Sequence, residues 1–159
     1  MKYRCRVWFS VILNAAFLLV YFCLFRPAFE TNDDYAIMSM VNGIKGIHDQ
    51  HLIYINSTLG SLLKVMYTWM PKVPWYPLLQ YVFIFVSMTV MTCVLLKWTQ
   101  GAAFWPVIAF LTIFTYQAYI KLQYTKTAGI CSSAGILLIF YALYGSAAYS
   151  DAKTKGKSK

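Results

Sequence analysis

Four long apolar runs divide the chain, and each has the length of a membrane-spanning helix. They cover about residues 7–25, 75–96, 102–120 and 128–149. A helix that crosses the hydrocarbon core needs roughly 20 mostly apolar residues, and none of the four runs contains Asp, Glu, Lys, Arg or His. The pattern predicts one transmembrane domain of four helices over residues 1–150. The first run is longer than the apolar region of a cleaved signal peptide, so we expect it to remain as a span.

The loop of residues 26–74, between the first two runs, has helical patterns of its own. Its first apolar positions recur at i, i+3, i+4 and i+7, as on one face of an amphipathic helix: Ile37, Met40, Val41 and Ile44. Thr31 and Asp34 form a T-x-x-D capping pattern at the expected start of this helix. A second apolar stripe runs along Thr58–Met70, which reaches roughly 20 Å as a helix and is too short to cross about 30 Å of hydrocarbon. We expect both helices at the outer membrane surface; the alternative is a tilted fifth span over Leu52–Met70.

Composition supports a membrane protein. The 159 residues are 60% hydrophobic, 18% aromatic and only 12% charged, and the mean hydropathy is +0.56. A soluble domain carries about 25% charged residues. The net charge of +9 comes from basic residues that lie between apolar runs, so we expect membrane lipids as partners and no nucleic acid. The sequence therefore predicts an all-α, polytopic membrane protein with four transmembrane helices and amphipathic juxtamembrane helices in the first outer loop.

Basic residues near the ends of the spans set the expected orientation, because Lys and Arg concentrate on the cytoplasmic side. Lys2, Arg4 and Arg6 precede the first run, and four lysines lie in the tail of residues 151–159. Both chain ends are thus expected in the cytoplasm of a multi-pass protein of the cell membrane. The loops of residues 26–74 and 121–127 then lie outside. The polar, lysine-rich tail is expected to be disordered.

Three of the five acidic residues occur in Glu30–Met38, shortly after the first span. Asp33 and Asp34 have two open interpretations. One is structural, because carboxylates at a helix start interact with its exposed N–H groups. The other is chemical: a carboxylate at the membrane boundary can accept a proton from a hydroxyl, or hold a divalent cation against a phosphate. Asp33 is the preferred catalytic candidate, because Thr31 offers Asp34 a capping role.

Two further polar clusters are candidates for substrate binding. His48, Asp49 and His51 form the sequence HDQH, which is either a proton relay, a metal partner for the aspartates, or a solvated loop. Gln123 and Lys126 lie in the predicted outer loop of residues 121–127. Lys126 has the charge to meet the phosphate of a lipid-linked substrate, and it equally suits an interfacial anchor.

Lone polar residues within the predicted spans are expected to make helix–helix hydrogen bonds: Asn14, Gln80 and Gln117. Asn56 begins an N-S-T glycosylation sequon and also suits a helix cap. The four cysteines have no CxxC spacing and indicate neither a disulfide framework nor a zinc site. The absence of an ionisable residue inside any span argues against a proton- or cation-coupled transporter.

Three segments carry a resemblance to a known family: ETNDDYAIMSMVNGIKG, HLIYINSTLGSLLKVMYTWMPKVPWY and LQYTKTAG. They resemble the N-terminal portion of GT-C-type integral membrane glycosyltransferases, and they are similar to segments of predicted polytopic membrane proteins of Gram-positive bacteria. The resemblance implies transfer of sugar from a polyprenyl-phosphate-linked donor in cell-envelope glycan assembly. It also implies that Asp33 or Asp34 matches the family's essential acidic residue in the first outer loop.

The chain departs from this family in its number of spans, because members commonly have eight or more and this sequence predicts four. It is therefore expected to be a fragment, a short relative or one part of an assembly with a membrane-protein partner. The alternative function is non-catalytic, as a flippase-like transporter or an assembly subunit.

Overall fold

The computed structural model describes residues 3–44, 46, 49–52, 54–99 and 104–156. Within these ranges the chain forms six helices: α1 (Tyr3–Leu24), α2 (Asn32–Val41), α3 (Ser57–Trp69), α4 (Trp75–Trp98), α5 (Phe104–Ile120) and α6 (Tyr124–Gly156). Two short strands join them: β1 (Ala28–Phe29) and β2 (Lys121–Leu122). The predicted helical fold class is confirmed, with this strand pair as an addition.

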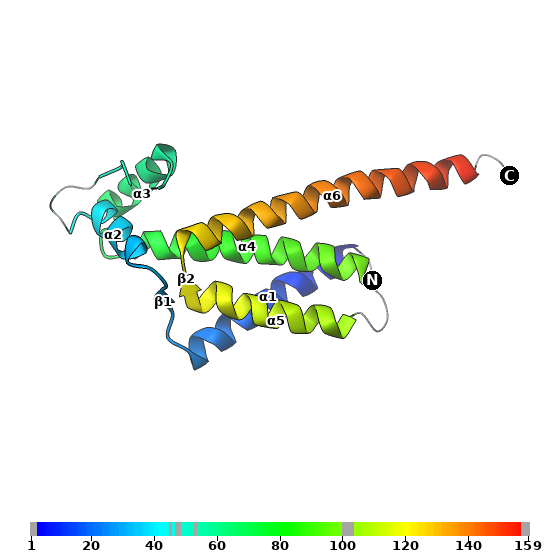
Figure 1. Ribbon diagram of the computed structural model, residues 1–159, viewed down its shortest axis with the longest axis horizontal. Helices are drawn as coiled ribbons and strands as arrows, with labels where there is room; N and C mark the ends of the chain where they lie inside the picture. Colours follow the sequence, from blue (N-terminus) through cyan, green and yellow to red (C-terminus); the bar gives the residue numbers. More distant parts are fainter. Residues whose placement is uncertain (1–2, 45, 47–48, 53, 100–103, 157–159) are drawn as a thin grey trace.

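Four helices form an elongated bundle, and the other two lie together at one end of it (Figure 1). Helix α1 packs against α4 and α5, and α4 also packs against α5 and α6. The four helices alternate in direction along the bundle. We call the end that carries α2, α3 and the strands the capped end. The opposite end, where α1 begins and α4 ends, is the basal end.

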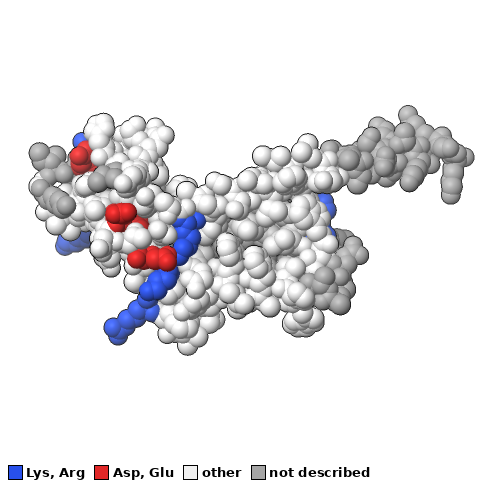
Figure 2. Space-filling view, viewed as in Figure 1, with Lys and Arg blue, Asp and Glu red and all other residues white. Residues whose placement is uncertain are grey.

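Three helices in the described part of the chain are long and apolar enough to cross a membrane. They are Cys5–Leu24, Trp75–Trp98 and Tyr124–Tyr144. Helix α5 is apolar but has 17 residues, or about 26 Å, and residues 100–103 before it lie outside the described ranges. On the face of the molecule that Figure 2 shows, charged side chains gather at the capped end. A long stretch of uncharged surface follows over the bundle. The structure is thus that of a helical protein suited to a membrane.

Helix α6 is longer than the sequence predicts at both ends. It begins at Tyr124 and continues through Gly156, beyond its neighbours in the bundle (Figure 1). Residues 151–156, which the composition predicts to be disordered, are therefore helical. Alanine and lysine in this segment are strong helix formers, which explains the continuation.

The capped end has its own apolar core, built from α2, α3 and the start of α4. Its buried members are Ile37, Val41, Leu52, Leu63, Tyr67 and Tyr76. Two positions of the predicted stripes face outward instead. Ile44 lies beyond the end of α2 and is 75% exposed, and Leu62 is 50% exposed. Helix α3 has 13 residues and packs against α2 and α4, so it belongs to this cap and is too short for the alternative fifth span.

Backbone contacts join the two loops at the capped end. Strands β1 and β2 pair in parallel, with Ala28 opposite Lys121, and the Glu30 N–H donates to the Leu122 carbonyl at 2.8 Å. The loop before α3 also passes close to that helix. A Cβ atom at Gly60 would lie 2.1 Å from the Gln50 carbonyl oxygen, so this position has room only for glycine.

Candidate functional site

Asp34 lies at the centre of a hydrogen-bond network at the capped end, and its side chain is fully buried. Its Oδ1 accepts hydrogen bonds from the Tyr76 hydroxyl at 2.7 Å, the Gln80 amide at 3.1 Å and the Tyr124 backbone N–H at 3.1 Å. Its Oδ2 accepts from the Thr31 hydroxyl at 2.9 Å. These donors replace the water that a buried carboxylate loses. Asp34 thereby joins α2 to α4 and to the start of α6.

Gln80 extends this network to a second residue of α6. The Thr127 hydroxyl donates to Gln80 Oε1 at 3.2 Å, while Gln80 Nε2 donates to Asp34. The amide of Gln80 is therefore oriented from both sides. We call Asp34, Thr31, Tyr76, Gln80, Tyr124 and Thr127 the Asp34 network.

Two of the three lone polar residues predicted to join helices do so. Gln80 links α4 to α6 through Thr127, and Asn14 links α1 to α4 by donating to Thr92 Oγ1 at 3.0 Å. Gln117 lies on α5 with its side chain exposed.

Helix α2 starts where the T-x-x-D pattern predicts, but the predicted side-chain cap by Thr31 is not formed. Thr31 is the N-cap residue, but its side chain accepts no hydrogen bond from the helix. Its hydroxyl donates to Asp34 instead, because this carboxylate is buried and needs a donor on Oδ2. Asn56 does cap a helix: its Oδ1 accepts from the Thr58 N–H at 2.8 Å at the start of α3.

Asp33 differs from its neighbour in being exposed. Within the described residues its carboxylate makes no hydrogen bond or ion pair, and it lies within electrostatic range of the Tyr124 phenol. Of the two candidate aspartates, Asp33 is thus accessible from the surface, and Asp34 is held within the fold.

The other candidate residues are distributed around the same end of the bundle. Lys126 forms an ion pair with Glu30 and donates to the Lys121 carbonyl at 3.0 Å, which ties the two loops together. Gln123 is half-buried, and its carbonyl accepts from Thr127. The sequence predicts Lys126 on the same side of the membrane as the aspartates, and in the structure its acidic partner is Glu30.

The predicted histidine cluster is an exposed turn in its described part. The His51 N–H donates to Asp49 Oδ1 at 2.8 Å, and the His51 side chain is exposed. His48 lies outside the described residues. Among the residues that are described, no three His, Cys, Asp or Glu side chains gather in a way that could hold a metal ion. Asp34 is poorly suited to a cation, because four donors already occupy its oxygens.

An apolar pocket of about 390 Å³ adjoins the Asp34 network between α3, α4 and α6. Its apolar walls come from these helices and the loop before α3: Ile55, Leu59, Leu63, Leu79, Phe83, Ala128 and Cys131. Its polar lining includes Tyr76, Gln80, Tyr124 and Thr127, all members of the network. Tyr54 stacks on Tyr124 with ring centroids 5.8 Å apart. The site thus combines an apolar pocket with one polar wall, whose side chains are held by the hydrogen bonds of the Asp34 network.

Sequence reasoning did not assign Tyr76 and Thr127 to this site. A usable signal was present, because Tyr76 and Gln80 are four residues apart on α4 and so share a helix face. The sequence does not show which residue contacts that face. In the structure it is Asp34 of α2.

Tyr67 supports the site from α3. Its hydroxyl oxygen accepts a hydrogen bond from the Tyr76 N–H at 3.0 Å. The N-cap residue of α4 is Pro74, which has no polar side chain to offer. Tyr67 therefore supplies the acceptor for a buried N–H of the first turn, which has no partner within the helix. Burial raises the pKa of the Tyr67 phenol above its usual value of 10.0, and the group remains neutral at physiological pH.

Comparison of the chain with protein-family models, curated proteins and solved structures gives no match. In its described part the chain is a helical protein with three helices able to cross a membrane. Two short helices cap one end, where a buried carboxylate network adjoins an apolar pocket between α3, α4 and α6.

Proposed function

We propose that the chain crosses the membrane four times, with both ends in the cytoplasm. Helix α4 ends at the basal end and α6 begins at the capped end, so the chain returns along the bundle through α5 (Figure 1). If α4 and α6 both span the membrane, α5 makes the crossing between them. Its 17 residues are at the lower limit for a span.

The charge distribution supports this orientation. Arg6 and Lys97 lie at the basal end, and in the sequence four lysines follow the last apolar run. The positive-inside rule assigns this end to the cytoplasm. Single cysteines placed at Asp33 and at Lys153, in a chain whose own cysteines are replaced by serine, test it with a membrane-impermeant thiol reagent. We expect labelling from opposite sides of the membrane. Labelling of both positions from one side would overturn the four-span proposal.

For activity, we propose a GT-C-like module that transfers sugar from a polyprenyl-phosphate-linked donor in cell-envelope glycan assembly. The observation that carries this proposal is the pocket of about 390 Å³ beside the Asp34 network. Its apolar walls suit an isoprenoid chain, and its polar wall suits the head group of the same molecule. The pocket lies at the capped end, where the candidate spans α4 and α6 begin.

The residues then have distinct roles. Asp33 is the general base for the acceptor hydroxyl, because it is exposed beside the network. Asp34 is a positioning residue, because it holds α2 against α4 and α6 through hydrogen bonds. Lys126 meets the lipid phosphate by exchanging its contact with Glu30 for one with the substrate.

Sugar transfer by the protein in proteoliposomes tests the assignment, with a panel of labelled polyprenyl-phosphate hexoses and pentoses as probes. Asp33→Asn is expected to lower transfer at least 100-fold, because general-base catalysis contributes about 10²–10⁴ in rate. Asp49→Asn is the matched control, since it makes the same change at an exposed position of the same loop. Transfer by Asp33→Asn at the wild-type rate would refute Asp33 as the base.

The ion pair between Lys126 and Glu30 favours a second candidate function. A lysine that is already neutralised suits a structural tie between two loops. A non-catalytic role, as a flippase-like protein or an assembly subunit, predicts that the wild-type chain binds a lipid-linked sugar without transferring it. Asp33→Asn would then leave binding unchanged.

A further inference from the structure

A second groove lies at the basal end, far from the Asp34 network, between α1, α4 and α6. Its volume is about 200 Å³. Arg6 enters it from α1, Lys97 from α4 and Tyr141 from α6. All three helices are candidate spans, and Lys97 is in the last turn of α4. The groove therefore lies where the membrane-crossing part of the bundle ends.

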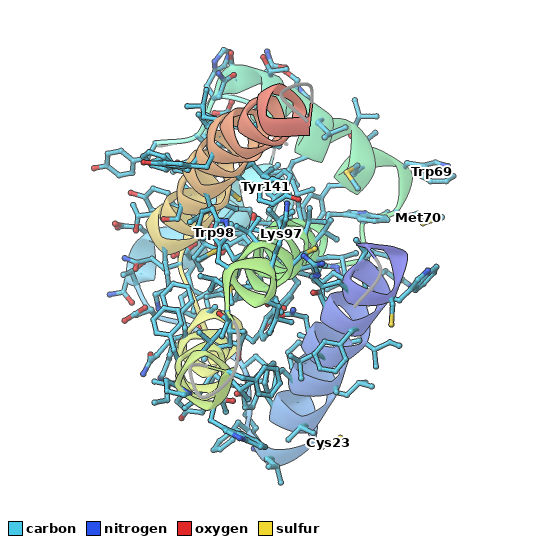
Figure 3. All side chains as sticks on the ribbon, turned by 90° about the vertical axis from the view of Figure 1, so that its right-hand side faces the viewer. Cys23, Trp69, Met70, Lys97, Trp98 and Tyr141 are labelled. Atoms are coloured by element: carbon cyan, nitrogen blue, oxygen red, sulfur yellow. The ribbon has the colours of Figure 1, made fainter. Side chains whose placement is uncertain are left out.

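The mouth of the groove is basic. Lys97 Nζ donates a hydrogen bond to the Tyr141 hydroxyl and lies 3.8 Å from the centroid of the Tyr141 ring. Figure 3 looks onto this end of the bundle and shows Lys97 and Tyr141 close together between α4 and α6, with Trp98 beside them. Tyr141 thus holds the ammonium group over the groove. Among the described residues that line it, two are basic and none is acidic.

The walls below the mouth are apolar. They include Val7 from α1, Val90 and Val94 from α4, and Leu138 from α6. Thr89 lines the deeper part, eight residues before Lys97 on α4 and hence about 12 Å along the helix axis. Its hydroxyl is buried and has no hydrogen-bond partner within the described part of the chain. A small soluble anion would leave these apolar walls unused, whereas a lipid fills them.

We propose that this groove binds one anionic phospholipid. The phosphodiester lies between the Arg6 guanidinium and the Lys97 ammonium, and one acyl chain runs along the valine and leucine walls toward Thr89. Basic pockets between transmembrane helices at the cytoplasmic side recognise anionic head groups through this combination of charge and apolar surface. Trp98 and Tyr141 add aromatic rings of the kind that lie at the level of lipid head groups. The inference is independent of sugar transfer, because it involves none of the residues of the capped end.

Trp98 provides a probe, because it adjoins Lys97 and its ring lies 6.5 Å from that of Tyr141. The full chain is reconstituted into phosphatidylcholine vesicles that contain a small fraction of brominated lipid, either phosphatidylglycerol or phosphatidylcholine. Bromine quenches tryptophan fluorescence on contact. The quenching of Trp98 is the difference between the wild-type chain and Trp98→Phe, which changes one exposed side chain.

We expect the site to bind brominated phosphatidylglycerol about 10- to 30-fold more tightly than brominated phosphatidylcholine. Each of the two basic side chains is expected to contribute about fivefold in affinity for the anionic lipid. The double variant Arg6→Gln, Lys97→Gln is expected to lose this preference. Lys72→Gln, an exposed lysine in the loop of the capped end, is the matched control and should keep it. Circular dichroism and retained quenching by phosphatidylcholine show that the double variant is folded in the bilayer.

Three results would overturn the proposal. They are equal quenching by the two lipids in the wild-type chain, an unchanged preference in the double variant, and loss of the preference in Lys72→Gln as well. Millimolar inorganic phosphate provides a further arm. It is expected to leave the quenching unchanged, and displacement of the lipid by phosphate would identify a site for free anions instead.

Discussion

Replacement of Asp34 by alanine is expected to release α2 from the bundle. The carboxylate is fully buried and accepts hydrogen bonds from four donors on three parts of the chain. Alanine removes every acceptor at once. The Tyr76 hydroxyl, the Gln80 amide and the Tyr124 N–H then lie at a buried site without their partner. Asp34→Asn is gentler, because its carbonyl oxygen can still accept from these three groups and its amide can donate to Thr31.

The magnitude follows from the number of donors that are left unsatisfied. Each buried donor without a partner costs about 1–3 kcal/mol. With three such donors and some entry of water into the space, we expect a loss of about 3–5 kcal/mol for Asp34→Ala, the range for removal of one partner of a buried charged pair. Asp34→Asn loses only the charge-assisted part of the bonds, or about 1–2 kcal/mol.

Hydrogen–deuterium exchange in detergent or nanodiscs measures this loss locally, because it reports the opening of individual segments. The amides of α2 should exchange at least about 100-fold faster in Asp34→Ala and about 5- to 30-fold faster in Asp34→Asn. Asp33→Ala is the control, since an exposed neighbour should change exchange less than about threefold. Equal exchange of α2 in Asp34→Ala and Asp33→Ala would refute the view that the network holds α2 in place.

Four further substitutions test the packing of the fold; unfolding in mixed micelles measures the first three, and amide exchange measures Tyr67→Phe. Gly60→Ala is expected to destabilise the chain by at least about 1 kcal/mol, because its Cβ would lie 2.1 Å from a backbone carbonyl oxygen. A Cβ at Gly135 would have no atom within 4 Å, so Gly135→Ala should be neutral or stabilising by up to about 1 kcal/mol. A loss of stability in both variants would contradict this steric explanation. Asn14→Leu removes the buried hydrogen bond to Thr92 and should cost about 0.6–1.7 kcal/mol; no change would mean that the contact contributes nothing. Tyr67→Phe removes the acceptor for the first turn of α4, so amides there should exchange about fivefold faster at a cost of about 1 kcal/mol, and unchanged exchange would count against this cap.

The sequence predicts the helices of the bundle well, because their apolar runs are long and uninterrupted. The predicted first and second spans agree closely with α1 and α4, and the amphipathic stretches correspond to α2 and α3. Their ends are governed by local signals such as Pro71 and Pro74, which the sequence displays directly. The length of α6 was harder to predict, because a polar lysine-rich segment is compatible with both helix and coil.

The candidate site was predictable in composition but not in geometry. Sequence reasoning places Asp33, Asp34 and Lys126 at one end of the bundle, and the structure brings the two loops together there through β1 and β2. The sequence does not reveal that Tyr76 and Thr127 belong to the Asp34 network. These residues are separated from Asp34 by 42 or more positions in the chain. Only the tertiary structure joins them, Tyr76 by a direct hydrogen bond to Asp34 and Thr127 through Gln80.

The sequence alone determined that this protein is helical, apolar and basic, and that three of its five carboxylates follow the first apolar run, because residue type and period are local properties. Only the tertiary structure decided between Asp33 and Asp34. The two residues have the same chemistry and differ by one position, or about 100° around α2. Which of them is buried depends on which side of α2 faces the donors of α4 and of the start of α6. That choice makes Asp34 the fixed centre of the network and leaves Asp33 exposed beside it.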